Sequence, residues 1–185
     1  AKSDCGNITD IFSNANTILI PDPVYPVYLD TNIMCGRKIV YMDGKPENNF
    51  LPMPDDSVKA DIIYLCSPNN PTGNVFPAIE IERLITAFDG IVVVDEAYID
   101  FSSRLSWIRR LNEFHNLVVL QTFSKAWGSA GVRLGMAFAS PDIIGYYNQV
   151  KYPYNISGLV QRYAMEMLDR ENEVRRWVDE ILSVR

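Results

Sequence analysis

Short, continuous apolar runs alternate with amphipathic stretches along this chain. The runs are rich in Ile, Val and Leu and span 17–20, 38–42, 61–66, 91–94 and 117–120, while helical patterns occupy 27–33, 78–88 and 105–114. Strands with this composition are buried on both faces, as in a parallel sheet covered by helices. The pattern predicts an α/β fold, a three-layer αβα sandwich around a mostly parallel sheet.

Further elements are predicted on either side of these runs. A helix is expected from about Asn7, a strand over 134–139 and a helix starting at Ser140-Pro141-Asp142, with serine as cap and proline in the first turn. Residues 157–185 are predicted to form one long terminal helix, with or without an interruption, and the Pro-, Asn- and Asp-rich segment 43–57 is predicted to be an exposed loop. No linker divides the chain, so 1–185 is expected to be one domain.

Composition excludes several classes of partner. The chain has 185 residues and a net charge of −6, which argues against binding to nucleic acid or to an anionic membrane. No apolar run approaches the length of a membrane span. Cys5, Cys35 and Cys66 show neither metal-ligand spacing nor a paired framework, so we expect no metal site and a cytoplasmic location.

Chemically active side chains follow three of the apolar runs. Asn70 follows 61–66, Asp95 ends the run at 91–94, and Lys125 follows 117–120 within Thr122-Phe123-Ser124-Lys125-Ala126-Trp127-Gly128. In open α/β sheets, ligands bind beyond the carboxyl ends of the strands. A lysine that forms an imine with pyridoxal 5′-phosphate (PLP) needs an acid for the pyridine nitrogen, a partner for the phenolic oxygen and ligands for the phosphate. The chain supplies each type.

The residue types suit particular parts of that cofactor. Lys125 is the candidate imine-forming residue, Asp95 would pair with the pyridine nitrogen, and Tyr98 and Asn70 would reach the phenolic oxygen. The structural alternatives are a solvated lysine, a helix-capping aspartate, a core tyrosine and a turn asparagine.

Phosphate requires converging donors, and a second group of residues offers them. Thr122 and Ser124 carry hydroxyls, and Arg133 carries a planar fork that matches phosphate oxygens. Ala1 and Lys2 precede the predicted helix at Asn7, where backbone N–H groups can hold a phosphate.

These residues together resemble the fold-type I PLP enzymes, specifically the class I/II aminotransferases. From about Asn74 onward the chain is similar to the histidinol-phosphate aminotransferases, on the segments 92–101, 122–135 and 151–155. Segments 1–8 and 22–32 are more similar to LL-diaminopimelate aminotransferases, which indicates a chimeric chain.

The resemblance implies a specific architecture and activity. Residues 1–185 would be the large, PLP-binding domain of the aspartate aminotransferase-like fold, without the amino-terminal arm and the small domain of the longer enzymes. The strand at 134–139 would run antiparallel, Tyr25 would stack on the pyridine ring, and Ala1 and Lys2 would lie in the phosphate loop. The family moves an amino group between an amino acid and a 2-oxo acid through the lysine imine, with a homodimer as the working unit.

Two alternatives stay open. The chain could be a truncated, recombined or engineered scaffold that binds PLP without efficient turnover, or an α/β domain without a cofactor. The second alternative leaves the spacing of Asn70, Asp95, Tyr98, Lys125 and Arg133 unexplained. Histidinol phosphate, diaminopimelate and aromatic amino acids all remain possible substrates.

Overall fold

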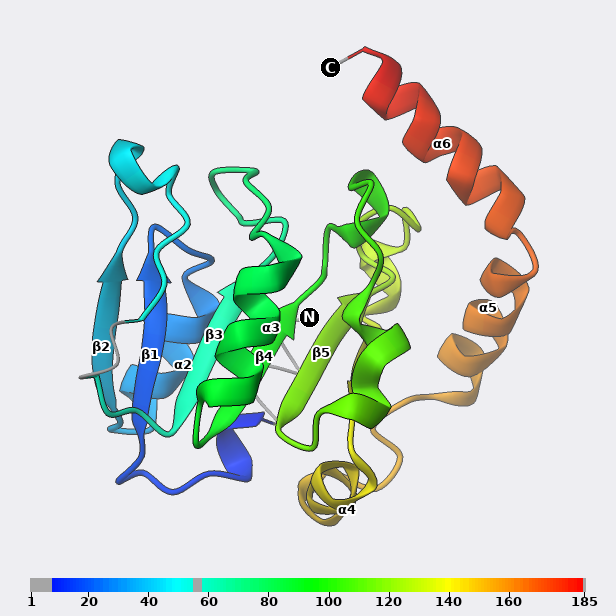
Figure 1. Ribbon diagram of the computed structural model, residues 1–185. Coiled ribbons are helices and arrows are strands. Elements are labelled where there is room, and N and C mark those ends of the chain that lie inside the picture. Colours follow the sequence, from blue (N-terminus) through cyan, green and yellow to red (C-terminus); the bar gives the residue numbers. More distant parts are fainter. Residues whose placement is uncertain (1–7, 55–57, 185) are drawn as a thin grey trace.

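The computed structural model describes residues 8–54 and 58–184, and a single sheet organises them (Figure 1). Its six strands lie in the order β2-β1-β3-β4-β5-β6. All neighbouring pairs are parallel except β5 and β6, which are antiparallel as the resemblance implied. The strands are β1 (Thr17–Asp22), β2 (Lys38–Asp43), β3 (Ile62–Cys66), β4 (Ile91–Asp95), β5 (Leu117–Thr122) and β6 (Gly135–Ala139).

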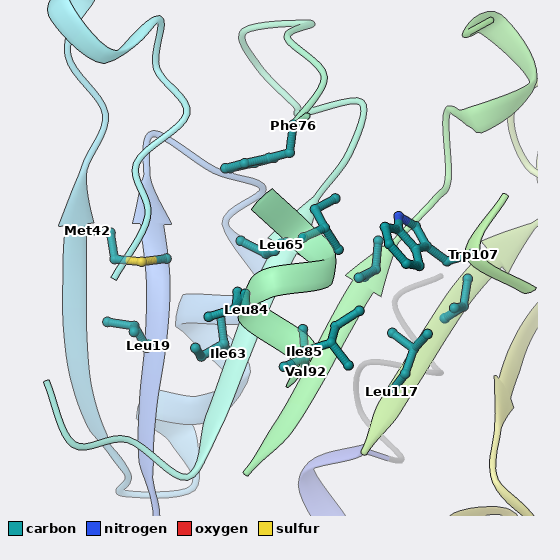
Figure 2. Packing of buried hydrophobic residues seen from close by; sticks show 13 residues of the cluster. Leu19, Met42, Ile63, Leu65, Phe76, Leu84, Ile85, Val92, Trp107 and Leu117 are labelled. Carbon is teal, nitrogen blue, oxygen red and sulfur yellow. The ribbon is translucent and has the colours of Figure 1, made fainter. Parts of the chain in front are cut away.

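Helices cover both faces of the sheet, which confirms the predicted αβα sandwich. Strand side chains alternate between two buried clusters, so Ile18 and Ile20 face one side and Leu19 faces the other. Helices α2 (Val27–Met34) and α4 (Pro141–Val150) pack on the first side. Helix α3 (Ala78–Ala87) packs on the second side, where Figure 2 shows Leu84 and Ile85 above the strands.

The segment predicted as a helix over 105–114 is a 3-10 helix instead. This element, η3, spans Trp107–Glu113, and its first turn is fixed from outside the helix. The Ser106 hydroxyl accepts from the N–H of Ile108 at 3.1 Å, and the carboxylate of Glu96 accepts from the N–H of Trp107 at 2.8 Å. The Glu96 contact comes from the residue after β4, so local periodicity did not reveal it.

The carboxy-terminal segment is helical with an interruption, which was one of the two predicted forms. Helix α5 spans Gly158–Leu168 and α6 spans Glu171–Ser183, with a break at Asp169 and Arg170 (Figure 1). Met167 before the break and Val174 after it both pack into one buried cluster with Phe123. The break lets both helices contact that cluster.

Two smaller expectations are refined. Helix α4 begins at Pro141 as predicted, but the Ser140 hydroxyl donates to the carbonyl of His115 at 3.2 Å instead of capping the helix. Within the predicted 43–57 loop, residues 43–49 are mostly exposed and contain a short 3-10 helix, η1 (Pro46–Asn48), whereas residues 50–54 are half-buried or buried and pack against the core through Leu51 and Met53. Within residues 8–54 and 58–184, no helix is long and apolar enough to cross a bilayer.

Candidate active site

The carboxyl ends of three central strands meet at one pocket. Cys66 at the end of β3 is in register with Asp95 at the end of β4, and Asp95 is in register with Leu120 on β5. The pocket has a volume of about 170 Å³. It is enclosed by the loops that follow these strands, by the turn after β1 and by Arg133, two positions before β6. The lining residues are Tyr25, Cys66, Asn70, Asp95, Ala97, Tyr98, Thr122, Ser124, Lys125 and Arg133.

The pocket therefore brings together all the predicted site residues that the structure describes. They come from separate loops, and parallel strand ends place them at the same edge of the sheet. Ala1 and Lys2, the predicted phosphate-loop residues, lie outside the described residues.

Asp95 forms the floor of the pocket. Its side chain is 6% exposed, Oδ1 accepts from the backbone N–H of Ala97 at 2.9 Å, and Oδ2 accepts from the hydroxyl of Tyr28. Hydrogen bonds donated to a carboxylate favour its charged form and offset the cost of burial. The geometry thus suits a fixed negative charge beneath a ligand.

Lys125 lines the same pocket and lies close to Tyr98. Its Nζ is 4.9 Å from the centroid of the Tyr98 ring, and the residue is exposed. The turn behind it is closed by bonds from the N–H of Gly128 to the carbonyl of Lys125 at 2.9 Å and from the N–H of Ser129 to the carbonyl of Phe123 at 2.9 Å. Gly128 has a φ of +61°, a conformation that favours glycine.

Ser124 and Arg133 are the best placed of the predicted phosphate donors. The Ser124 Oγ is buried without a hydrogen-bond partner among the described residues. Arg133 is exposed, has a φ of +58° and uses Nη1 to donate to the carbonyl of Ala130 at 3.0 Å. The hydroxyl proton of Thr122 is donated to the carbonyl of Leu134 at 3.2 Å, and its oxygen accepts from the N–H of Ser124 at 3.1 Å. Thr122 therefore holds the turn.

Cys66 is a lining residue that sequence reasoning did not assign to the site. Burial, reinforced by the charge of Asp95, raises the pKa of its thiol to about 12. The thiol therefore stays protonated at neutral pH, and Sγ donates to the carbonyl of Pro68 at 3.3 Å. It is a neutral, compact wall of the pocket rather than a nucleophile.

Glu96 is adjacent to Asp95 in sequence but belongs to a different network. It is 1% exposed, and its carboxylate accepts from the Ser106 hydroxyl at 2.5 Å, from the N–H of Trp107 and from the Gln121 amide at 2.9 Å. Burial raises its pKa. Glu96 anchors η3 behind the turn that presents Asp95 and Tyr98.

A doubly covered sheet carries a lysine, a buried carboxylate, a buried hydroxyl and a guanidinium group around one pocket beyond its strand ends, the arrangement typical of a ligand-binding α/β domain. The family model for aminotransferase class I and II matches residues 7–183, and the chain belongs to that family.

Curated relatives refine this assignment. Histidinol-phosphate aminotransferase of Parabacteroides distasonis is 55% identical over 124 residues, which cover 67% of this chain and 36% of that protein. The enzyme of the same name from Bacteroides fragilis strain YCH46 is 45% identical over 168 residues, which cover 88% of this chain and 48% of that protein. The chain thus spans between about a third and a half of the length of these relatives.

Solved structures show the same fold. The aspartate aminotransferase of Thermus thermophilus with maleate superposes with a TM-score of 0.86 at 22% identity, over 98% of this chain and 50% of that one. The histidinol-phosphate aminotransferase of Sinorhizobium meliloti in complex with pyridoxal-5′-phosphate gives 0.83 at 22% identity, over 97% of this chain and 51% of that one. The fold is therefore that of an aspartate aminotransferase-like large domain.

The separate resemblance of the amino-terminal third to LL-diaminopimelate aminotransferases gains no support from these relatives. An alignment that covers 88% of the chain must include part of that third, so similarity to the histidinol-phosphate enzymes extends into it. A chimeric origin is not needed to explain the sequence.

Proposed function

We propose that residues 1–185 form the large, cofactor-binding domain of a PLP-dependent aminotransferase. The observation that carries this proposal is the convergence of Tyr25, Asn70, Asp95, Tyr98 and the Lys125 turn on one pocket. Histidinol phosphate is the proposed amino donor and a 2-oxo acid the acceptor, supported by the identity of up to 55% to histidinol-phosphate aminotransferases.

The residues of the pocket fit the cofactor. The partnerless buried hydroxyl of Ser124 and the guanidinium of Arg133 would bind the phosphate, and backbone groups at Ala1 and Lys2 would complete that cradle. Tyr25 would lie against the ring, and Asn70 and Tyr98 would donate to its phenolic oxygen. Asp95 would accept from the protonated ring nitrogen.

When bound, PLP supplies an electron sink for the bond-breaking step at the substrate's α carbon. The side chains do the rest. Lys125 would hold the cofactor covalently through Nζ and, once released, would move the proton at the α carbon. Asp95 would keep the ring nitrogen protonated, and Tyr25 would fix the plane of the ring. A second pocket of about 420 Å³, which shares Asn70 and Tyr98, offers room for a substrate.

The cofactor assignment is tested by reductive trapping. The chain is mixed with PLP, treated with borohydride and digested, and the pyridoxyl group is located by mass spectrometry. We expect the label on Lys125, its loss in Lys125→Ala and its retention in Lys151→Ala, since Lys151 is exposed and does not line the pocket. Labelling of Lys2 or Lys151 in place of Lys125 would overturn the assignment.

We also propose that the whole enzyme works as a homodimer in the cytoplasm. The support for association is a set of exposed apolar side chains: Tyr152, Tyr154, Leu159 and Met165 are 78%, 98%, 77% and 66% exposed. Such surface tends to be covered by association. Sedimentation analysis should show a dimer, and a clean monomer at high concentration would contradict this.

A further inference from the structure

A tyrosine below the pocket holds the buried carboxylate in place. Tyr28, on α2, is 0% exposed, and its hydroxyl donates to Oδ2 of Asp95, 67 positions along the chain. Oδ1 is held separately by the N–H of Ala97 at 2.9 Å. Because two different elements each hold one oxygen, the plane of the carboxylate is fixed.

The Tyr28 ring is itself locked. It stacks on Tyr64 with a centroid distance of 4.9 Å and an interplanar angle of 18°. It also meets Tyr25 edge to face, at 5.7 Å and 84°. The backbone behind it is tied down, since the side-chain amide of Asn32 donates to the carbonyl of Tyr28 at 2.7 Å. The hydroxyl is therefore a preorganised donor.

We propose that Tyr28 is a positioning residue for the ring nitrogen of the cofactor, acting through Asp95. A buried carboxyl group loses the stabilisation that water gives its charge, and a donated hydrogen bond restores part of it. Tyr28 thereby keeps Asp95 charged and aimed, so that the carboxylate pairs with a protonated pyridine nitrogen. This inference rests on the proposed function. The same segment would supply Tyr25 to the face of the ring and Tyr28 to the acid beneath it.

The test separates this role from simple core packing by comparing two probes. Pyridoxine 5′-phosphate has the pyridine nitrogen but lacks the aldehyde, so it cannot bond to Lys125. Its carbocyclic analogue replaces the ring nitrogen with C–H and cannot pair with Asp95. Affinities are measured by calorimetry for the unaltered chain, Tyr28→Phe and the matched control Tyr64→Phe, which removes the hydroxyl of the stacked ring and keeps the Tyr28–Asp95 bond.

We expect Tyr28→Phe to weaken binding of pyridoxine 5′-phosphate by about tenfold, the effect of losing one hydrogen bond to a charged group. The ultraviolet spectrum of the bound probe should show its nitrogen losing its proton about one pH unit lower. The carbocyclic probe should bind Tyr28→Phe as it binds the unaltered chain, and Tyr64→Phe should change neither result. In an Asp95→Asn background, Tyr28→Phe should have no further effect on the pyridine probe.

Equally weakened binding of both probes to Tyr28→Phe would show a structural role and overturn the inference. Unchanged binding of pyridoxine 5′-phosphate to Tyr28→Phe would also overturn it, as would a further loss of affinity when Tyr28→Phe is added to Asp95→Asn. Failure of the unaltered chain to bind either probe would overturn the proposed function, and this inference with it. Should Tyr28→Phe not fold, 3-fluorotyrosine at position 28 supplies a more acidic hydroxyl of nearly the same shape. It should raise the pH at which the bound nitrogen titrates, and no change would count against the role.

Discussion

Substitution of Glu96, whose carboxylate lies behind the site, is expected to lower the free energy of unfolding. Substitution Glu96→Ala removes three hydrogen bonds, to the N–H of Trp107, the hydroxyl of Ser106 and the amide of Gln121. The Trp107 N–H is buried and would lose its partner, which costs about 1–3 kcal/mol. The other two donors are half-buried and can reach water, at about 0.5–1.5 kcal/mol each. The expected loss of unfolding free energy is about 2–6 kcal/mol.

The pH dependence of the stability contributed by Glu96 tests its burial more directly than the total loss of unfolding free energy does. Burial raises its pKa in the folded state, so its contribution to stability is full below the unfolded-state pKa of about 4.3 and is lost as pH rises through the folded-state value. Glu96→Gln keeps the size and removes the titration. The stability difference between the unaltered chain and Glu96→Gln should therefore shrink as pH rises, by at most about 1.4 kcal/mol per pH unit.

Urea unfolding followed by circular dichroism between pH 4 and pH 8 measures both effects. Urea is suitable because its midpoint and slope together give the free energy of unfolding at each pH. A pH-independent difference between the unaltered chain and Glu96→Gln would refute the assigned burial of charge. A loss below about 0.5 kcal/mol in Glu96→Ala would refute the role of Glu96 as the anchor of η3.

Three further outcomes are expected. Cys66, with a thiol pKa of about 12, should resist iodoacetamide at pH 8 in the folded chain while the half-buried Cys35 reacts, as peptide mapping would show; rapid labelling of Cys66 would contradict its burial. Ser124→Ala should weaken PLP binding by about tenfold or more, since a hydrogen bond to a charged phosphate is lost, and an unchanged dissociation constant would remove Ser124 from the phosphate site. Residues 1–185 alone should transaminate slowly because Lys125 is exposed to water, and turnover typical of the family would show that these residues suffice.

Much of the site was predictable because its reactive side chains lie at or just after the ends of strands. The runs before Asn70, Asp95 and Lys125 marked three strands, and parallel ends must share one edge of a sheet. Tyr28 left no comparable signal, since its bond to Asp95 spans 67 positions and its own surroundings look like an ordinary helix. The sequence also did not place Cys66 at the site, because a buried thiol at a strand end has no diagnostic spacing.

The break between α5 and α6 shows the same limit. The residues around it, Leu168-Asp169-Arg170-Glu171, contain neither glycine nor proline, so local propensity gives no position for an interruption. Tertiary packing of Met167 and Val174 against Phe123 decides the geometry. Likewise, η3 takes its form from bonds to Glu96, which belongs to another part of the chain.

Helices α5 and α6 pack against the turn that carries Ser124 and Lys125. The order of this turn therefore depends on the two helices. Phe123 and Ala126, the residues on either side of Ser124 and Lys125, are buried in the same cluster as Met167, Val174 and Val178. Units with few contacts open before the rest of a protein unfolds. When these two helices detach, the turn loses its backing while the sheet and Asp95 stay in place. Slow exchange of the amide hydrogens of residues 123–129 would then follow the opening of α5 and α6, and Lys125 would lose its fixed position without any global unfolding.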